Sequence, residues 1–122
     1  MANILVMDDE EPIRSMVRQM LERAGHTVRE AADGAEGLAL FRASRPDLVI
    51  TDILMPNKGG LVAIKEIRQL DPGAKILAMS GGGKDGKLNF LSTARTFEGL
   101  ETLRKPFTRA QLLTAVNGLL TG

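Results

Sequence analysis

The strongest constraint on the fold is a regular alternation of short apolar runs with segments of helical periodicity. The runs that suit strands occupy residues 4–7, 27–30, 48–52, 75–79 and 100–103. Each run is followed by a segment in which apolar residues recur three and four positions apart, the spacing of an amphipathic helix. These helical segments cover residues 12–24, 34–45, 61–70, 88–97 and 109–120. Strand and helix alternating in this way predict a parallel β-sheet with helices on both faces.

The polarity of the runs predicts their order in the sheet. Residues 4–7, 48–52 and 75–79 are almost wholly apolar, as in strands that are buried on both faces. Residues 27–30 are half polar and suit an edge strand. With right-handed crossovers, we expect an α/β fold with a five-stranded doubly wound parallel sheet of order 2-1-3-4-5, which is flavodoxin-like. A chain of this length forms a single core, so we expect one domain over residues 1–122.

The composition argues against several classes of function. The chain has 16 basic and 15 acidic residues and a net charge of +1, whereas nucleic-acid and membrane-surface binders carry clustered basic charge. No apolar run approaches membrane-spanning length, and the N-terminus lacks the basic segment of a signal peptide. There is no cysteine and hence no cysteine-based zinc site. We therefore expect a cytoplasmic protein with no nucleic-acid partner and no membrane partner.

Polar side chains gather where the predicted strands end. Asp8 and Asp9 follow the first strand, Asp52 ends the third, and Ser80 and Lys105 follow the fourth and fifth. Ligand sites of open α/β sheets form beyond the carboxyl ends of neighbouring strands. Each acid taken alone is as well explained as a helix cap or turn residue. Their joint placement predicts a shared site.

The chemistry of this set points to phosphoryl transfer. Three carboxylates in one cleft repel one another unless a cation joins them. Mg²⁺ suits such a set because it prefers oxygen ligands. Lys105 adds a compact positive charge and Ser80 a hydroxyl donor. A carboxylate in these surroundings can attack phosphorus and form an aspartyl phosphate.

The sequence resembles the response-regulator receiver domains of bacterial two-component systems, which have the chemotaxis-regulator-like fold. The matching residues are Asp8-Asp9, Asp52 with Met55-Pro56, Ser80, and Lys105-Pro106-Phe107. The resemblance covers nearly the whole chain and keeps these motifs in the family's order.

The resemblance implies a role for each site residue. Asp52 would be the phosphoacceptor, and Ser80 and Lys105 would contact the phosphoryl group. Asp9, Asp52 and the backbone carbonyl of Leu54 would bind Mg²⁺ directly. Asp8 would act mostly through metal-bound water.

The resemblance also implies the partners and the mode of action. The phosphoryl group would come from a sensor histidine kinase or a histidine phosphotransfer protein, and phosphorylation would signal to a downstream target protein by conformational change. The protein would catalyse only its own phosphotransfer and dephosphorylation and act as a monomer or weak homodimer. We expect a stand-alone receiver, with a receiver excised from a longer regulator as the alternative. One departure from the family is Thr102, which stands where Tyr or Phe usually precedes the lysine by three residues.

Two other functions are compatible with parts of the sequence. A metal-dependent aspartyl phosphatase would use Asp52 as its nucleophile, but such enzymes commonly carry a second Asp at the position of Leu54. A P-loop-like nucleotide hydrolase would use residues 81–87, which fit G-x-x-x-x-G-K, although Leu88 replaces the expected Ser or Thr.

Overall fold

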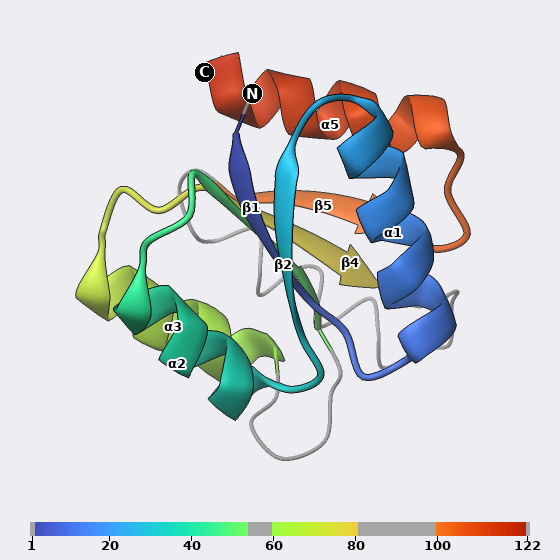
Figure 1. Ribbon diagram of the computed structural model, residues 1–122. Coiled ribbons are helices and arrows are strands. Elements are labelled where there is room, and N and C mark those ends of the chain that lie inside the picture. The colour runs from blue at the N-terminus through green and yellow to red at the C-terminus, as the bar shows by residue number, and fades with distance from the viewer. Residues whose placement is uncertain (1, 54–59, 81–99, 122) are drawn as a thin grey trace.

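The computed structural model describes residues 2–53, 60–80 and 100–121, and its described strands form one parallel sheet (Figure 1). The strands are β1 (Asn3–Met7), β2 (Thr27–Ala31), β3 (Leu48–Asp52), β4 (Ile76–Ser80) and β5 (Leu100–Arg104). Their order is β2-β1-β3-β4-β5, which confirms the predicted flavodoxin-like arrangement with the half-polar strand at an edge. The helix predicted over residues 88–97 lies outside the described residues.

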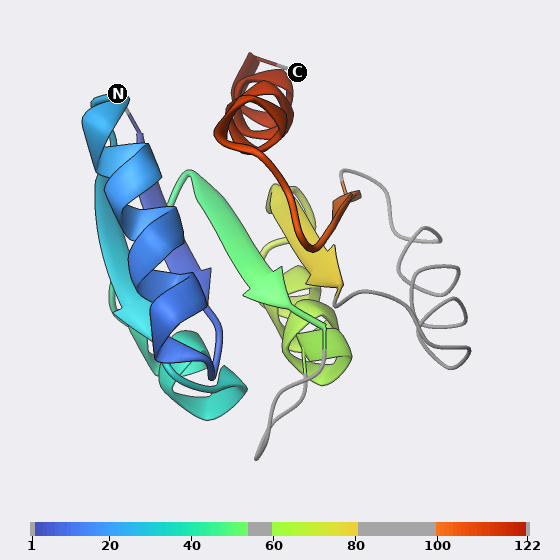
Figure 2. The same ribbon diagram turned by 90° about the vertical axis from the view of Figure 1, so that its right-hand side faces the viewer.

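The described helices cover both faces of the sheet. They are α1 (Glu11–Arg23), α2 (Gly34–Ala43), α3 (Gly60–Leu70) and α5 (Arg109–Thr121). Figure 1 shows α1 and α5 on one side of the strands and α2 and α3 on the other, and Figure 2 turns the same ribbon so that the side of α1 faces the viewer. None of these helices has the length and apolar character needed to span a bilayer.

Successive residues of each central strand point to opposite helix layers, because side chains alternate along a strand. In β1, Ile4 and Val6 pack in the apolar cluster that includes α1 and α5. Leu5 and Met7 pack in the cluster that includes α2 and α3. All residues of β3 and β4 are buried, as expected for strands covered on both faces.

Local signals set the helix ends. Pro12 lies in the first turn of α1, where its missing amide hydrogen is no loss, and Gly25 follows the helix with a φ of 95°. At the start of α5, Thr108 and Gln111 form a capping box. The Gln111 amide donates to Thr108 Oγ1 at 3.1 Å, and the Thr108 amide donates to Gln111 Oε1 at 2.8 Å.

The strand register brings the carboxyl ends of the central strands to one edge of the sheet. Met7 pairs with Thr51, Asp52 with Met79, and Ser80 with Arg104. The residues that end these strands, and those that directly follow them, therefore share one edge. This edge is where the sequence predicts a site.

Candidate functional site

Two acidic side chains and one lysine meet at this edge. Lys105 Nζ lies 2.9 Å from Asp8 Oδ2 and 3.3 Å from Asp52 Oδ2. Asp8 is 0% exposed, Asp52 6% and Lys105 9%. Buried charges of opposite sign stabilise one another only when the geometry is close, so the three groups form one electrostatic unit.

The backbone places Lys105 beside this pair of acids. Its amide donates to the carbonyl of Ser80 at 2.7 Å, which extends the pairing of β5 with β4 by one residue. The peptide bond between Lys105 and Pro106 is cis.

The surroundings of Lys105 favour the charged form of its side chain. Burial alone would lower the pKa of its ammonium group, because desolvation disfavours the charged form. Hydrogen bonds and attraction to Asp8 and Asp52 outweigh burial, and the net effect raises the pKa of Lys105. The site therefore keeps a positive charge beside its carboxylates at neutral pH.

Ser80 ends β4 at the same edge. The residue is 3% exposed, and its Oγ has no hydrogen-bond partner within the described ranges. Leaving a buried hydroxyl unpaired costs free energy, so this oxygen is a donor available to a further group.

The two predicted acidic residues of the β1–α1 turn differ in burial. Asp8 is buried, and its Oδ1 accepts a hydrogen bond from the Glu10 amide at 2.9 Å. Asp9 is exposed. The N-cap of α1 is Glu10, which makes no side-chain capping bond. Asp8 therefore serves the site and the turn rather than the end of the helix.

Glu10 is the site residue that sequence reasoning missed. One carboxylate oxygen from each of Asp8, Glu10 and Asp52 lies within 4.8 Å of the others, a grouping that could hold a metal ion. Glu10 Oε1 also lies 3.7 Å from Lys105 Nζ. Asp9 is not in this group among the described residues, and Leu54 lies outside them. The run of acids from Asp8 to Glu11 indicates that carboxylates gather here. It does not indicate which of these side chains turn toward Lys105.

The donor set fits a hard divalent cation. Carboxylate oxygens are the ligands that Mg²⁺ takes in proteins, and described residues of this site offer no sulfur or imidazole ligand. The charge balance also fits, because several carboxylates face a single lysine.

Comparison with known proteins gives consistent matches over the whole fold. A family model described as the response regulator receiver domain matches residues 4–117. The chain is 33% identical over 118 residues to the chemotaxis protein CheY of Halobacterium salinarum, covering 97% of this chain and 96% of that protein.

Solved structures give the same result. The crystal structure of the NtrX receiver domain from Brucella abortus superposes with a TM-score of 0.90 at 30% identity, covering 97% of this chain and 98% of the other. The crystal structure of NtrX from Brucella abortus in complex with ADP gives a TM-score of 0.91 at 30% identity. That match covers 98% of this chain and 27% of the NtrX chain.

These matches favour neither the aspartyl phosphatase nor the nucleotide hydrolase, and the P-loop-like residues 81–87 lie outside the described ranges. The family model spans the three strand ends that supply Asp8, Asp52 and Lys105, and the relatives are matched almost from end to end. The chain belongs to the response regulator receiver domain family.

Proposed function

We propose that Asp52 is the phosphoacceptor of this receiver domain and that it takes its phosphoryl group from a phosphohistidine. The donor would be a sensor histidine kinase or a histidine phosphotransfer protein. The observation that carries this proposal is the Asp52 carboxylate at the end of β3, 3.3 Å from Lys105 Nζ and 6% exposed. A carboxylate so placed is restrained beside a positive charge, as a nucleophile in phosphoryl transfer requires.

In the proposed transfer, one bond to phosphorus forms and one breaks. An Oδ of Asp52 forms a bond to phosphorus while the bond from phosphorus to the donor's imidazole nitrogen breaks. The imidazole nitrogen keeps the bonding electron pair. Lys105, already positioned by Asp8 and Asp52, stabilises negative charge on the phosphoryl oxygens, and Ser80 Oγ donates a hydrogen bond to one of them.

Mg²⁺ would be held by the acidic residues of this edge. Asp52 and Asp8 are supported by their burial and proximity, and Glu10 by its place in the same group. Asp9 and the backbone carbonyl of Leu54 are proposed as direct ligands from the family resemblance. When bound, the cation offsets the charge of the carboxylates and of the transferring phosphoryl group.

The output would be a change in protein–protein contact. Phosphorylation adds negative charge at Asp52 and biases the surrounding edge of the sheet toward a second arrangement. A downstream target protein would recognise that arrangement. We further propose that residues 1–122 form one receiver domain, that it acts in the cytoplasm as a monomer or weak homodimer, and that its catalysis is limited to its own phosphotransfer and dephosphorylation.

Incubation with Mg²⁺ and a small phosphodonor, followed by intact mass measurement, tests this proposal. We expect a gain of one phosphoryl group in the unmodified chain and no gain in Asp52→Asn. Asp47→Asn is the matched control, because Asp47 directly precedes the other end of β3 and accepts a hydrogen bond from the Asn3 amide at 2.8 Å. It should gain the phosphoryl group normally. A folded, unmodified chain that gains no mass would refute the proposal.

A further inference from the structure

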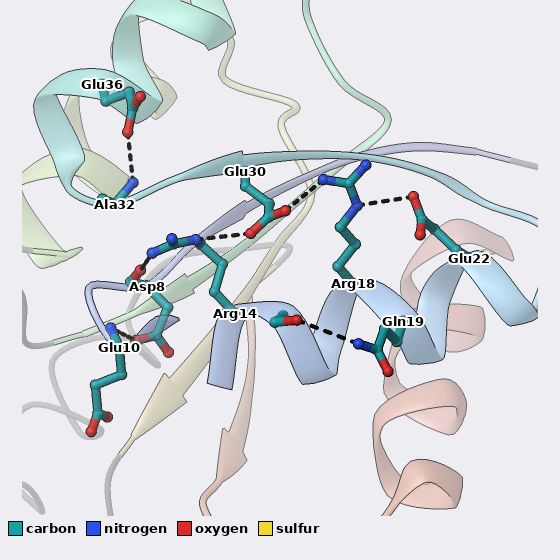
Figure 3. Close-up of polar contacts among 10 residues, drawn as sticks. Asp8, Glu10, Arg14, Arg18, Gln19, Glu22, Glu30, Ala32 and Glu36 are labelled. Atoms are coloured by element: carbon teal, nitrogen blue, oxygen red, sulfur yellow. Dashed lines mark hydrogen bonds and ion pairs between the residues drawn. The ribbon is translucent and has the colours of Figure 1, made fainter. Parts of the chain in front are cut away.

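Arg14 of α1 reaches the predicted metal site through the backbone. Its Nη1 donates to the Asp8 carbonyl at 2.7 Å, and its Nε donates to Glu30 Oε1 at 2.9 Å (Figure 3). The Arg14 side chain is 15% exposed, so these bonds are partly shielded from water. Hydrogen bonds from a charged donor are stronger than neutral ones, and the planar guanidinium fixes the direction of both.

The Asp8 carbonyl lies just beyond the paired part of β1. The ladders with β2 and β3 end at Met7, and the Asp8 amide donates to Ala31 at 3.1 Å. The carbonyl therefore takes its donor from Arg14 instead of from a neighbouring strand. Without this donor, it would be a partly buried acceptor at the start of a turn.

The orientation of this carbonyl controls the turn that follows. The Asp8 carbonyl and the Asp9 amide belong to one planar peptide unit, so fixing one fixes the other. The Arg14 amide also donates to the Glu10 carbonyl at 3.0 Å, which ties the far end of the turn. The side chain of Arg14 thus fixes the start of the segment that carries three candidate ligands, Asp8, Asp9 and Glu10, while the backbone of α1 fixes its end whatever the side chain.

A second arginine provides a natural comparison. Arg18 lies one helical turn after Arg14 and donates to the other carboxylate oxygen of Glu30. It also donates to Glu22 at 3.0 Å. Figure 3 shows Glu30 between the two arginines, with Arg14 directed toward Asp8 and Arg18 toward Glu22. Both arginines therefore donate to Glu30. Among the described contacts, only Arg14 also donates to a residue of the site, Asp8.

We propose that Arg14 is a positioning residue that holds the Asp8–Glu10 turn in the arrangement in which its carboxylates bind a divalent cation, with Glu30 orienting Arg14. This inference rests on the proposed function of the site. Replacing residues that hydrogen-bond to metal ligands, without touching the metal themselves, commonly weakens metal affinity by about 10–100-fold.

Calorimetric titration of Mg²⁺ into the full chain tests the proposal, with Arg14→Met and Arg18→Met as a matched pair. Methionine keeps most of the stem packing and removes every donor. We expect Arg14→Met to weaken Mg²⁺ binding about tenfold or more. Arg18→Met should stay within about twofold of the unmodified chain, because it loses only ion pairs away from the site.

A readout without metal separates positioning from general stability. The Glu10 amide donates to Asp8 Oδ1, so its hydrogen exchange reports whether the turn is held. Exchange at Glu10 should be faster in Arg14→Met and unchanged in Arg18→Met, measured under conditions in which both variants are folded. Arg14→Lys is the second variant if Arg14→Met does not fold. It keeps the charge but cannot span Glu30 and the Asp8 carbonyl with two nitrogens, so it should also bind Mg²⁺ more weakly.

The outcomes distinguish this inference from the proposed function. Mg²⁺ binding within about twofold of the unmodified chain in the folded Arg14 variants would overturn the inference alone. Absence of Mg²⁺ binding by the unmodified chain would overturn the proposed function, and the inference with it. Equal weakening in Arg14→Met and Arg18→Met would also overturn the inference, because the effect would then follow from losing the shared ion pair with Glu30.

Discussion

The ammonium group of Lys105 lies 2.9 Å from Oδ2 of Asp8, although 97 positions separate the two residues in the sequence. Asp8 is 0% exposed, and the same ammonium contacts Asp52 at 3.3 Å. One cation therefore compensates two buried carboxylates in the resting protein. The charges that hold this edge of the sheet together are the same ones to which we assign the proposed phosphoryl transfer.

Replacing Lys105 should destabilise the fold. In Lys105→Met the two acids lose the ammonium group that contacts both of them, and breaking a buried pair typically costs about 3–5 kcal/mol. Urea unfolding without divalent cations measures this loss. Addition of Mg²⁺ should restore part of the stability, because a cation can again neutralise the acids. Lys65→Met on the exposed face of α3 is the control and should change stability by less than about 0.5 kcal/mol. An equally small loss in Lys105→Met would contradict the prediction.

The ion pairs of Lys105 also predict a loss of stability at alkaline pH. Burial acts to lower the pKa of Lys105, but its bonds to Asp8 and Asp52 raise it above the ordinary value of 10.5. The folded state thus binds this proton more tightly than the unfolded state does. The resulting stability is complete below about pH 10.5 and is lost as the pH rises through the folded pKa. The urea midpoint of the unmodified chain should fall more steeply above about pH 10.5 than that of Lys105→Met. Parallel curves would show that other groups cause the alkaline loss.

Ser80 should matter for phosphorylation and hardly for stability. Its Oγ is buried without a partner among the described residues, so Ser80→Ala removes an unpaired polar atom at little cost. We expect a free energy of unfolding within about 1 kcal/mol of the unmodified chain, or slightly higher. Phosphoryl incorporation from a small donor should fall by at least about tenfold, because a donor to the transferring group is lost.

Thr51→Val is the contrasting variant for Ser80→Ala. Thr51 Oγ1 is buried and donates to the Asp52 carbonyl at 2.9 Å, so its removal breaks a real bond. It should cost about 1 kcal/mol. If Ser80→Ala destabilises the fold as much as Thr51→Val, the hydroxyl of Ser80 has a structural partner and the prediction is wrong.

The sheet order was predictable because polarity and position agree along the chain. The half-polar run at residues 27–30 became the edge strand, and the apolar runs became the central strands. Asp8, Ser80 and Lys105 could be placed for the same reason, since each ends a strand or directly follows one. At such positions the backbone alone decides which residues meet.

The acidic turn after β1 was less predictable. Asp9 and Glu10 are neighbours of the same charge, and only the path of the turn decides which carboxylate approaches Lys105. That path depends on Arg14, whose bond to the Asp8 carbonyl crosses from helix to strand end. A contact between a side chain and a backbone carbonyl leaves no periodic pattern in the sequence. Position along the chain therefore does not predict that Glu10 approaches the lysine.

Gly60 should be required for the position of Asp52. It begins α3, its amide donates to the Ile53 carbonyl at 2.9 Å, and a Cβ here would overlap the Asp52 carbonyl oxygen and lie 2.7 Å from the Ile53 Cα. Because these are backbone atoms, Gly60→Ala must displace the end of β3 or the start of α3. We expect the free energy of unfolding in urea to fall by about 1–3 kcal/mol, together with reduced phosphoryl incorporation at Asp52.

Gly118→Ala is the matched control, since a Cβ there meets nothing within 4 Å and alanine favours the α5 helix by up to about 1 kcal/mol. The two glycine variants should therefore shift stability in opposite directions. A neutral Gly60→Ala with normal phosphorylation would show that the end of β3 tolerates the displacement.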